Sequence, residues 1–376
     1  MLRKSLYAIA ALLVAAGLWG FYTRFATGHE QAAYGSYVVW GLWVAQYLFF
    51  AGLAGGLFFF ASLDLLFGVR RFEGLGRIAL FAALVSLGAG LLHIWLDLGH
   101  LFRIWKVYLN PNPQSVMAQI VWGYTIFGLI TLAVLVLTAR SRASRAPRSL
   151  MVVGLVLALF LSGGVGALLG VMGARPFWHV GLLPVQFPVF SLGSAAAALL
   201  VILGLFGSPR DPRRQAQLWT LALITVGVQV TKLYFLWADF SQSLYGGIPE
   251  NVKAVEMLVS GPYWWAFWGL QVLVGSLVPI LLLSVPSFAR NSTWASLGGL
   301  LVLAGFSVAR ANIVLPALAV PEMEALTRAF TESRLQFSYF PSPMEWSVTA
   351  GIIGIACLAF MIGLERLPLG VAEATE

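Results

Sequence analysis

The sequence predicts an all-α integral membrane protein with ten transmembrane helices, and two features of its composition lead to that class. Hydrophobic residues make up 60% of the 376 residues and charged residues only 10%, whereas soluble proteins are about 45–50% apolar and about 25% charged. Glycine, with 39 copies, is also more frequent in transmembrane helices than in soluble ones. A water-soluble globular protein is therefore excluded.

Runs of apolar residues define the expected helices in order. A helix that spans a bilayer needs about 20 mostly apolar residues. Between charged or Pro/Gly-rich breaks we find ten such runs, at residues 5–22, 38–67, 76–98, 116–139, 149–173, 188–207, 216–238, 262–288, 292–316 and 344–365. The first run follows Arg3 and Lys4, as in a signal peptide, but it is long and lacks a convincing small-x-small cleavage site. We therefore expect a retained anchor helix.

The positions of Lys and Arg predict the orientation. Of these 23 residues, 14 lie in the N-terminal tail and the loops on its side, seven lie on the opposite side, and Lys232 and Arg310 lie inside spans. Because cytoplasmic loops carry the excess of Lys and Arg, we expect both termini in the cytoplasm and the chain in a prokaryotic cytoplasmic (inner) membrane. The net charge of +8 reflects these loops, so we expect membrane lipid and not nucleic acid as a partner.

The opposite, extracytoplasmic side carries the longer loops. Residues 100–115, 174–188 and 239–261 are rich in aromatic residues, Pro and Asn. Long loops gathered on one side predict a docking or ligand-binding face. The single cysteine, Cys357, excludes a disulfide framework, a zinc ribbon and a cysteine-ligated iron–sulfur cluster within this chain.

The end of the third span carries the main candidate for chemistry. In the segment HIWLDLGH, His93 and Asp97 are four residues apart and therefore share one face of a helix. Ionisable residues inside spans are costly and mark functional sites. A histidine and a carboxylate together can accept or donate two protons, as the chemistry of a hydroquinone requires. The alternative is a helix-end pair that reaches to the membrane interface.

Further polar and aromatic groups are expected at the same outer depth. If spans two to five form a bundle, these groups converge near its outer mouth and could bind a quinone. They are Gln46, Gln119, Trp122, Tyr124, Arg175 and His179. The alternative reading of the aromatic members is an interfacial belt.

Ionisable residues in the other spans are candidates for a proton path. They are Asp64, Lys232, Asp239, Arg310 and Glu345. The alternative is structural pairing of the two cations with the carboxylates of Asp239 or Glu345. The inner halves of the spans are nearly bare of ionisable groups, so no continuous proton wire across the membrane is visible.

The four histidines bear on haem binding. A cytochrome b with two haems needs two facing pairs of buried histidines, and only His93 is clearly inside a span. That class is therefore excluded, and one haem between His93 and His179 is left as an alternative. The residues predict no metal site.

Several stretches together resemble a known family. They are WGLWVAQYLFFAGLAGG (40–56), LDLGHLFRIWKVYLNPNPQS (96–115), PFWHVGLLPVQFPVFSL (176–192), SGPYWWAFWGLQVLVGSLVPILLL (260–283), RAN (310–312) and YFPSPMEW (339–346). In this order the chain resembles the NrfD-like family, the quinone-reactive membrane subunits of polysulfide-reductase-type oxidoreductases. The match is closest to its ten-helix branch, which includes membrane subunits of hydrogenases and of alternative complex III.

The resemblance implies an architecture, a partner set and roles for residues. It implies two four-helix bundles, helices 2–5 and 6–9, flanked by helices 1 and 10. The corresponding units are residues 1–37 (anchor helix and outer loop), 38–175 (first bundle, with the quinone site), 176–316 (second bundle) and 317–376 (outer loop, tenth helix and tail).

Family members have no haem or iron–sulfur cluster of their own. The resemblance implies that this chain exchanges electrons between quinol, such as menaquinol, and an extracytoplasmic, ferredoxin-like iron–sulfur subunit. That subunit serves a catalytic molybdopterin or cytochrome subunit. Asp97 and His93 then become the acid–base groups, and Arg310 and Asn312 match the family's Arg-x-Asn.

Two departures from the family pattern leave alternatives open. The stretch LSGGVGALLG (161–170) lacks the His-Gln-Ser-containing pattern common in longer members, and His100 stands where Arg usually follows LDLG. The first departure predicts either a relocated pocket or a membrane anchor of a redox complex without its own quinone site. A proton- or ion-translocating subunit is the further alternative.

Overall fold

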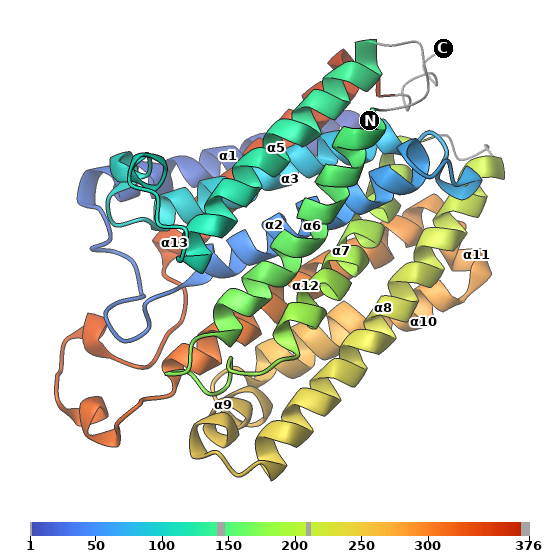
Figure 1. Ribbon diagram of the computed structural model, residues 1–376. Coiled ribbons are helices and arrows are strands. Elements are labelled where there is room, and N and C mark those ends of the chain that lie inside the picture. Colours follow the sequence, from blue (N-terminus) through green and yellow to red (C-terminus); the bar gives the residue numbers. More distant parts are fainter. Residues whose placement is uncertain (1, 141–146, 208–211, 370–376) are drawn as a thin grey trace.

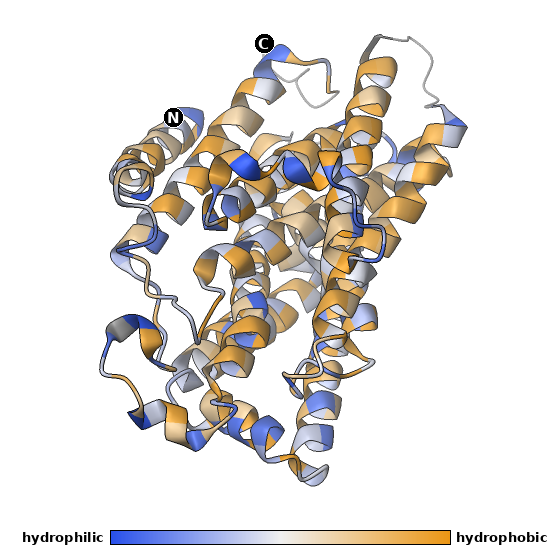
Figure 2. Ribbon diagram, turned by 60° about the vertical axis from the view of Figure 1, so that its left-hand side comes forward, coloured by the Kyte–Doolittle hydropathy of each residue, from blue (hydrophilic) through white to orange (hydrophobic). Residues whose placement is uncertain are grey.

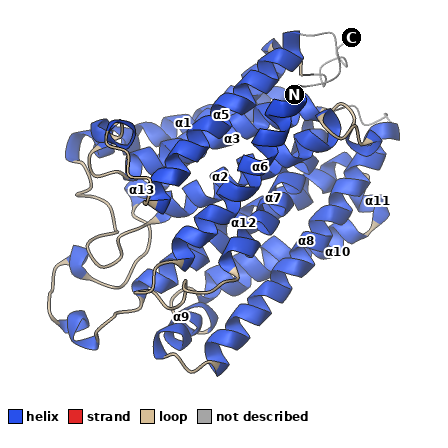
Figure 3. Ribbon diagram, viewed as in Figure 1, coloured by secondary structure: helices blue, strands red, loops and turns tan. Residues whose placement is uncertain are grey.

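The computed structural model describes residues 2–140, 147–207 and 212–369, and every regular element in these ranges is helical (Figure 3). Within them, ten helices are long and apolar enough to cross a membrane. They are α1 (Leu2–Thr27), α2 (Leu42–Leu65), α3 (Gly76–Asp97), α5 (Val116–Arg140), α6 (Arg148–Gly170), α7 (Leu183–Phe206), α8 (Pro212–Tyr245), the continuous pair η3 (Trp265–Leu277) and α10 (Val278–Ser284), α12 (Ser292–Ala319) and α13 (Pro343–Arg366). The predicted fold class and the ten spans are confirmed.

Short helices occupy the connections. They are η1 (Arg70–Phe72), η2 (Leu101–Arg103), α4 (Lys106–Leu109), α9 (Pro249–Val259), α11 (Pro286–Ala289), η4 (Glu324–Arg328) and η5 (Ser333–Leu335). Several predicted helix ends differ from those observed by four to seven residues; the largest difference is in α8, which continues to Tyr245 where the sequence predicted an end at residue 238. Helix α7 begins at Leu183, and Pro184 lies in its first turn. Proline is tolerated at this position because backbone N–H groups in the first turn have no partner within the helix. Helix α10 ends at Ser284, just before Pro286 starts α11.

Helices α1 and α13 form an antiparallel pair. Gly17 and Gly351 meet backbone to backbone, and the N–H of Gly20 donates to the hydroxyl of Ser347 at 3.0 Å. Small residues of this kind let transmembrane helices approach closely. The beginning of α1 and the end of α13 therefore lie at one end of the bundle, which we call the terminal face (Figure 1). The other end, the long-loop face, carries residues 98–115, 171–182, 246–264 and 320–342.

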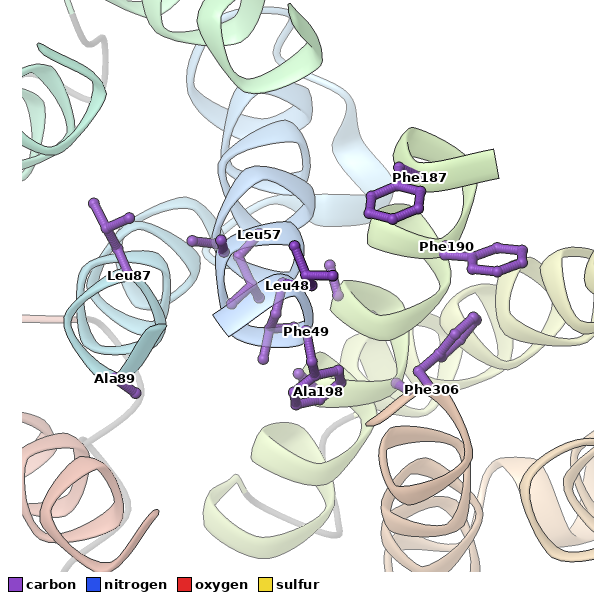
Figure 4. Close-up of a cluster of buried hydrophobic side chains, with 14 of the residues drawn as sticks. Leu48, Phe49, Leu57, Leu87, Ala89, Phe187, Phe190, Ala198 and Phe306 are labelled. Carbon is purple, nitrogen blue, oxygen red and sulfur yellow. The ribbon is translucent and has the colours of Figure 1, made fainter. Parts of the chain in front are cut away.

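Helix α2 lies at the centre of the molecule. It packs against α3, α6, α7, α12 and α13, and it is the most buried of the spans. Its segment GLAGG makes this possible, because a side chain at Gly56 would overlap the backbone carbonyl of Ser191 on α7. Figure 4 shows the apolar contacts at this centre, where Leu48 and Leu57 of α2 lie between α3 and α7.

The long helices fall into two packed groups. Helices α2, α3, α5 and α6 contact one another as the first group, and α7, α8, η3–α10 and α12 form the second. The pair α1–α13 packs on α3 and α2 from outside. This packing agrees with two four-helix bundles flanked by the first and last spans. Division of the chain into units at residues 38–175 and 176–316 stays a prediction.

The long helices are hydrophobic over most of their lengths (Figure 2), and many of their large apolar side chains are exposed. Examples are Leu12, Leu129, Phe160 and Leu281, each at least 63% exposed. In water such a surface would be unfavourable, whereas lipid tails cover it without cost. The helices therefore turn apolar faces both to one another and to the surrounding bilayer.

Candidate functional site

A cavity of about 950 Å³ opens in the first helix group at the long-loop face. Its walls come from α2, α3, α5 and α6, and the segment from Leu98 to Tyr108 covers one side. Most of the lining is apolar, with Trp40 and Trp95 as its largest members. Helix α6 contributes only Val165, Leu168 and Leu169. The volume falls in the range of about 300–1,000 Å³ that is typical of small-molecule sites.

Two tyrosines present unpaired hydroxyls to this cavity. Tyr47 of α2 and Tyr124 of α5 both line it, and their rings meet edge to face at 6.3 Å between centroids. Within the described part of the chain, neither hydroxyl has a hydrogen-bond partner. Buried tyrosine hydroxyls usually find one, so both are available to a bound ligand.

Asp97 supplies the carboxylate of the cavity. It is the last residue of α3 and lies in the lining. Its Oδ1 atom is buried and has no hydrogen-bond partner among the described residues. The side chains of Tyr34 and Arg24 interact with this carboxylate, and the Glu345 carboxylate lies near enough to repel it. An unpaired buried carboxylate oxygen beside a cavity can accept a proton from a ligand.

His93 does not line the cavity, although it lies one turn before Asp97. Its side chain is fully buried, its Nδ1 lies 2.8 Å from the Ala89 carbonyl oxygen, and its ring stacks on Phe50 at 5.5 Å between centroids. Its Nε2 atom has no partner within the described residues. The helix turns this side chain toward α2, so the predicted pair is divided between the cavity and the packed interior.

Of the six predicted quinone-binding residues, Tyr124 is the one that lines the cavity. Gln46 exchanges hydrogen bonds with Ser307 of α12, at 2.8 and 3.1 Å. The Trp122 indole donates to the Val107 carbonyl at 3.0 Å and thereby fixes the covering segment to α5. Trp122 is therefore a structural neighbour of the cavity.

The remaining three predicted ligands bind backbone carbonyls in loops or at the ends of helices. Gln119 donates to the Pro113 carbonyl at 2.6 Å, and a ring nitrogen of His179 lies 2.7 Å from the Gly170 carbonyl. Arg175 donates to the carbonyls of Ala317 and Val320 and forms a 3.2 Å salt bridge with Glu322. These three side chains stabilise the long-loop face. The six predicted quinone-binding residues therefore do not all meet at the mouth of the first bundle.

Arg310 connects the second helix group to the cavity. Its guanidinium stacks over the Phe187 ring at 3.8 Å from the ring centroid, and its charge acts on Tyr124. Its Nη1 atom has no partner among the described residues. Asn312 instead donates to Gln271 at 2.6 Å. Arg310 therefore presents positive charge behind the wall that holds Tyr124.

The other proton-path candidates occupy separate places. Lys232 is fully buried, with Nζ 4.7 Å from the Phe306 ring centroid, and neither Nζ nor Oδ1 of Asp239 has a partner within the described ranges. Asp64 accepts from the Gly76 N–H at 2.7 Å and so caps α3. Among described residues, no salt bridge joins Lys232 or Arg310 to a carboxylate.

Glu345 is fully buried at the start of α13 and ties the loop before α2 to that helix. Its carboxylate accepts hydrogen bonds from the N–H groups of Ala33, Leu42 and Ser342 and from the Tyr339 hydroxyl. Burial, and then the Glu345 carboxylate, raise the pKa of Tyr339 well above its ordinary value. Glu345 therefore has a structural role in this loop.

Sequence reasoning missed three residues beside Asp97, namely Arg24, His29 and Tyr34. The Arg24 guanidinium donates to the carbonyls of Leu96 and Leu98, each at 2.7 Å, and lies 2.8 Å from His29 Nε2. His29 Nδ1 in turn lies 2.6 Å from the Tyr34 hydroxyl. In the sequence Arg24 looks like a loop charge and His29 like one more histidine, because spacing along the chain does not reveal contacts between α1, a loop and α3.

Burial sets the protonation of two of these groups. Burial, followed by the nearby Arg24 charge, lowers the pKa of His29. Burial, followed by the Asp97 and Glu345 carboxylates, raises the pKa of Tyr34. At neutral pH, His29 is therefore uncharged and Tyr34 keeps its proton. No group of three or more His, Cys, Asp or Glu residues in the described ranges is arranged to hold a metal ion.

Comparison with known proteins places this geometry in a family. The chain is 29% identical to a subunit of the selenate reductase of Mesobacillus selenatarsenatis, over 98% of this chain and 95% of that protein. It is 26% identical to the Hdr-like menaquinol oxidoreductase integral membrane subunit of Archaeoglobus fulgidus, with the same coverage. It is 23% identical to the menaquinone reductase integral membrane subunit of Nitratidesulfovibrio vulgaris, over 95% of this chain and 90% of that protein.

A family model agrees with the relatives and with the ten-helix fold. The model described as "Polysulphide reductase, NrfD" matches residues 30–322. This range contains both helix groups and every residue named above as lining the cavity. The chain belongs to the NrfD polysulphide reductase family.

Proposed function

We propose that this chain is the quinone-reactive membrane subunit of a multisubunit oxidoreductase. It exchanges electrons between quinol, such as menaquinol, and an extracytoplasmic iron–sulfur subunit. The observation that carries the proposal is the cavity of about 950 Å³, with its apolar walls, its two free tyrosine hydroxyls and its single carboxylate. The names of the relatives from Archaeoglobus fulgidus and Nitratidesulfovibrio vulgaris, a menaquinol oxidoreductase subunit and a menaquinone reductase subunit, support the same assignment.

The lining suits a quinone in shape and polarity. A quinone is a flat apolar ring with two oxygens on opposite sides, so it needs apolar walls and a few placed polar groups. Trp40, Trp95 and Leu168 supply apolar surface. The hydroxyls of Tyr47 and Tyr124 can donate to one oxygen while Asp97 faces the other.

Proton transfer is assigned to Asp97. When quinol is oxidised, it releases two electrons and two protons, and a carboxylate within hydrogen-bond reach can take one proton directly. The second proton leaves to water, and the two electrons pass to the iron–sulfur partner subunit. His93 stays a predicted acid–base group, but its place behind the cavity wall favours a supporting role through α3 packing.

The long-loop face is the proposed docking surface. Its 320–342 segment is held by the salt bridges Arg175–Glu322 and Lys253–Glu324. The bias of Lys and Arg along the chain supports a position of this face outside the cytoplasm. An iron–sulfur subunit docked there would lie next to the cavity and would connect it to a catalytic molybdopterin or cytochrome subunit.

Filling the cavity tests the proposal. Gly88 of α3 lies in the lining, and a side chain added there would meet open space. Gly88→Phe in the intact complex is expected to lower quinol oxidation at least about tenfold and to reduce co-purified quinone. Gly227→Phe is the matched control, since Gly227 lies on α8, away from the cavity, and also faces open space.

The alternative is a membrane anchor without its own quinone site. This alternative is supported by α6, which contributes only apolar side chains to the cavity and so offers no polar contact to a quinone. Normal quinol oxidation by both Gly88→Phe and Asp97→Asn complexes would establish this alternative and overturn the proposal.

A second candidate function is proton translocation through the second helix group. Buried Lys232 and Gln229 on α8, and Asp239 further along the same helix, all have unpaired polar atoms among the described residues. These three residues along α8 would suit proton exchange, because unpaired polar groups inside a membrane span are costly and therefore mark functional sites. Quinol-driven acidification by complexes in liposomes, lost in Lys232→Met, is the expected result if this candidate holds.

A further inference from the structure

The covering segment, Leu98–Tyr108, folds back along an exposed side of α5. The Trp122 indole donates to the Val107 carbonyl at 3.0 Å, and the hydroxyls of Tyr108 and Thr125 are hydrogen-bonded at 2.7 Å. Thr125 is exposed and lies nine residues beyond the start of α5, which is about 14 Å along the helix axis. The segment therefore lies beside a membrane span, at the depth of the bilayer interface, instead of projecting into water.

The exposed side chains of the covering segment suit that interface. Four large side chains are each at least 42% exposed, namely those of Phe102, Ile104, Trp105 and Tyr108. Aromatic residues are enriched where a bilayer meets water, because their rings contact acyl chains while their polar atoms reach the headgroups. In water, four such side chains on one short segment would be unfavourable. They therefore indicate that lipid covers the segment.

Two cations, Arg103 and Lys106, lie among these side chains. They are three residues apart and exposed, and within the described ranges neither forms a salt bridge or a side-chain hydrogen bond. Lys106 Nζ lies 5.9 Å from the centre of the Trp105 ring. Long cationic side chains at this depth extend their charged ends to the headgroup layer, where each positive charge strengthens association with an anionic lipid.

The protein around the covering segment supplies no counter-charge for these cations. Helices α1, α3, α5 and α6 contain a single carboxylate, Asp97, and residues 98–115 contain none. Among the described residues, neither Asp97 nor Glu30, in the loop after α1, forms a salt bridge with them. The two positive charges are therefore available to an anion from outside the chain.

Helix α5 continues the same surface toward the membrane interior. Leu129, Leu132 and Val136 follow Thr125 at spacings of four, three and four residues, so they share one face of the helix. All three side chains are at least 36% exposed. An acyl chain whose headgroup lies at the covering segment can extend along this stripe.

We propose that the covering segment binds an anionic phospholipid, with Arg103 and Lys106 on its headgroup and Trp105 at the start of its acyl chains. The acyl chains lie along the exposed stripe of α5. A bound lipid holds the segment against α5 and so forms part of the outer boundary of the cavity. The site does not depend on the proposed quinol chemistry, since lipid binding involves no redox step.

Lipid binding by the purified chain in detergent tests this site without turnover. Native mass spectrometry measures the binding of phosphatidylglycerol, which is anionic, and of phosphatidylcholine, which has no net charge. Two cations at a headgroup are expected to favour phosphatidylglycerol at least about tenfold in the wild type, since each strengthens association about fivefold. The variant Arg103→Gln/Lys106→Gln is expected to lose most of this preference and to bind phosphatidylcholine as the wild type does.

Two further variants separate a site from a general effect of charge. Arg328→Gln is the matched control, because Arg328 is an exposed cation of η4 on the same long-loop face. Its preference for phosphatidylglycerol is expected to stay within about twofold of the wild type, since its charge lies away from the covering segment. If the double variant does not fold, Lys106→Gln tests the same site with an expected loss of about fivefold.

Each other result overturns the lipid site. An equal preference for phosphatidylglycerol in the wild type and in the double variant does so directly. An equal loss in Arg328→Gln does so because net charge alone would then explain binding. Unchanged lipid binding with loss of a partner subunit from the double-variant complex would assign the two cations to an acidic protein surface, and full displacement of the lipid by millimolar inorganic phosphate would assign them to a free anion. None of these results bears on the proposed quinol oxidation, which Gly88→Phe and Asp97→Asn test.

Discussion

At the scale of single residues, the proposed quinol chemistry depends on the carboxylate of Asp97 and the hydroxyls of Tyr47 and Tyr124, which line an otherwise mostly apolar cavity. We expect Asp97→Asn to lower quinol oxidation at least about a hundredfold, because a positioned general base typically contributes that much. The variant keeps the shape of the side chain, so the complex should assemble normally. Steady-state kinetics on the purified complex will check this, and a rate within threefold of wild type would exclude Asp97 as the proton acceptor.

The two tyrosines should affect binding more than proton transfer. Each hydroxyl can contribute one hydrogen bond to a quinone oxygen, worth about 0.5–1.5 kcal/mol. Tyr47→Phe and Tyr124→Phe are therefore each expected to weaken inhibitor binding about two- to tenfold, with the acid limb of the pH profile unchanged. Titration with a quinone analogue measures this effect. Unchanged affinity in the double variant would place the quinone elsewhere.

The lowered pKa of His29 predicts that the stability of the folded chain depends on pH. This pKa is lower in the folded chain than its ordinary value, because of burial and the Arg24 charge. The folded state therefore binds fewer protons than the unfolded state as the pH falls below about 6.5, so stability is lost on acidification. Thermal unfolding at pH 7.5 and pH 5.5 should show a larger decrease in the wild type than in His29→Gln. An equal decrease would contradict this contribution.

At the scale of elements, the glycines of α2 determine how closely the two helix groups meet. A side chain at Gly56 would overlap the Ser191 carbonyl, and one at Gly227 on α8 would meet open space. Gly56→Ala is expected to destabilise the fold by about 1–3 kcal/mol through overpacking, and Gly227→Ala should be near neutral. Melting temperatures of the two variants in the same detergent provide the comparison. Equal melting temperatures would show that α2 and α7 can separate freely.

The helices also show which structural features could be predicted from the sequence alone. Hydropathy predicted every span, with ends that differ from the observed ones by at most seven residues, because a helix in lipid must be apolar over its whole length whatever its neighbours are. Hydropathy could not predict how each helix is rotated about its own axis, and therefore which neighbour each side chain faces. Gln46 and Tyr47 are adjacent on α2, yet one bonds Ser307 of α12 and the other faces the cavity.

At the scale of the whole molecule, the orientation of the two faces can be tested by labelling. Cys357 is the one cysteine, so its replacement by Ser creates a background for single-cysteine labelling. We expect a membrane-impermeant maleimide to label Glu332→Cys on the long-loop face of intact cells. Arg71→Cys on the opposite face should react only after the cells are opened. The reverse pattern would invert the topology and the proposed docking side.

The sequence by itself determined the membrane class, the ten spans, the family resemblance and Asp97 as a candidate, because these depend on local composition and on order along the chain. Only the tertiary structure decided which polar groups share the cavity. It separated His93 from Asp97, directed Gln119, Arg175 and His179 to backbone carbonyls in loops and at helix ends, and brought Arg24, His29 and Tyr34 to the end of α3. The physical reason is that a side chain's surroundings inside a bundle depend on the rotation and packing of several helices, and no single segment encodes them.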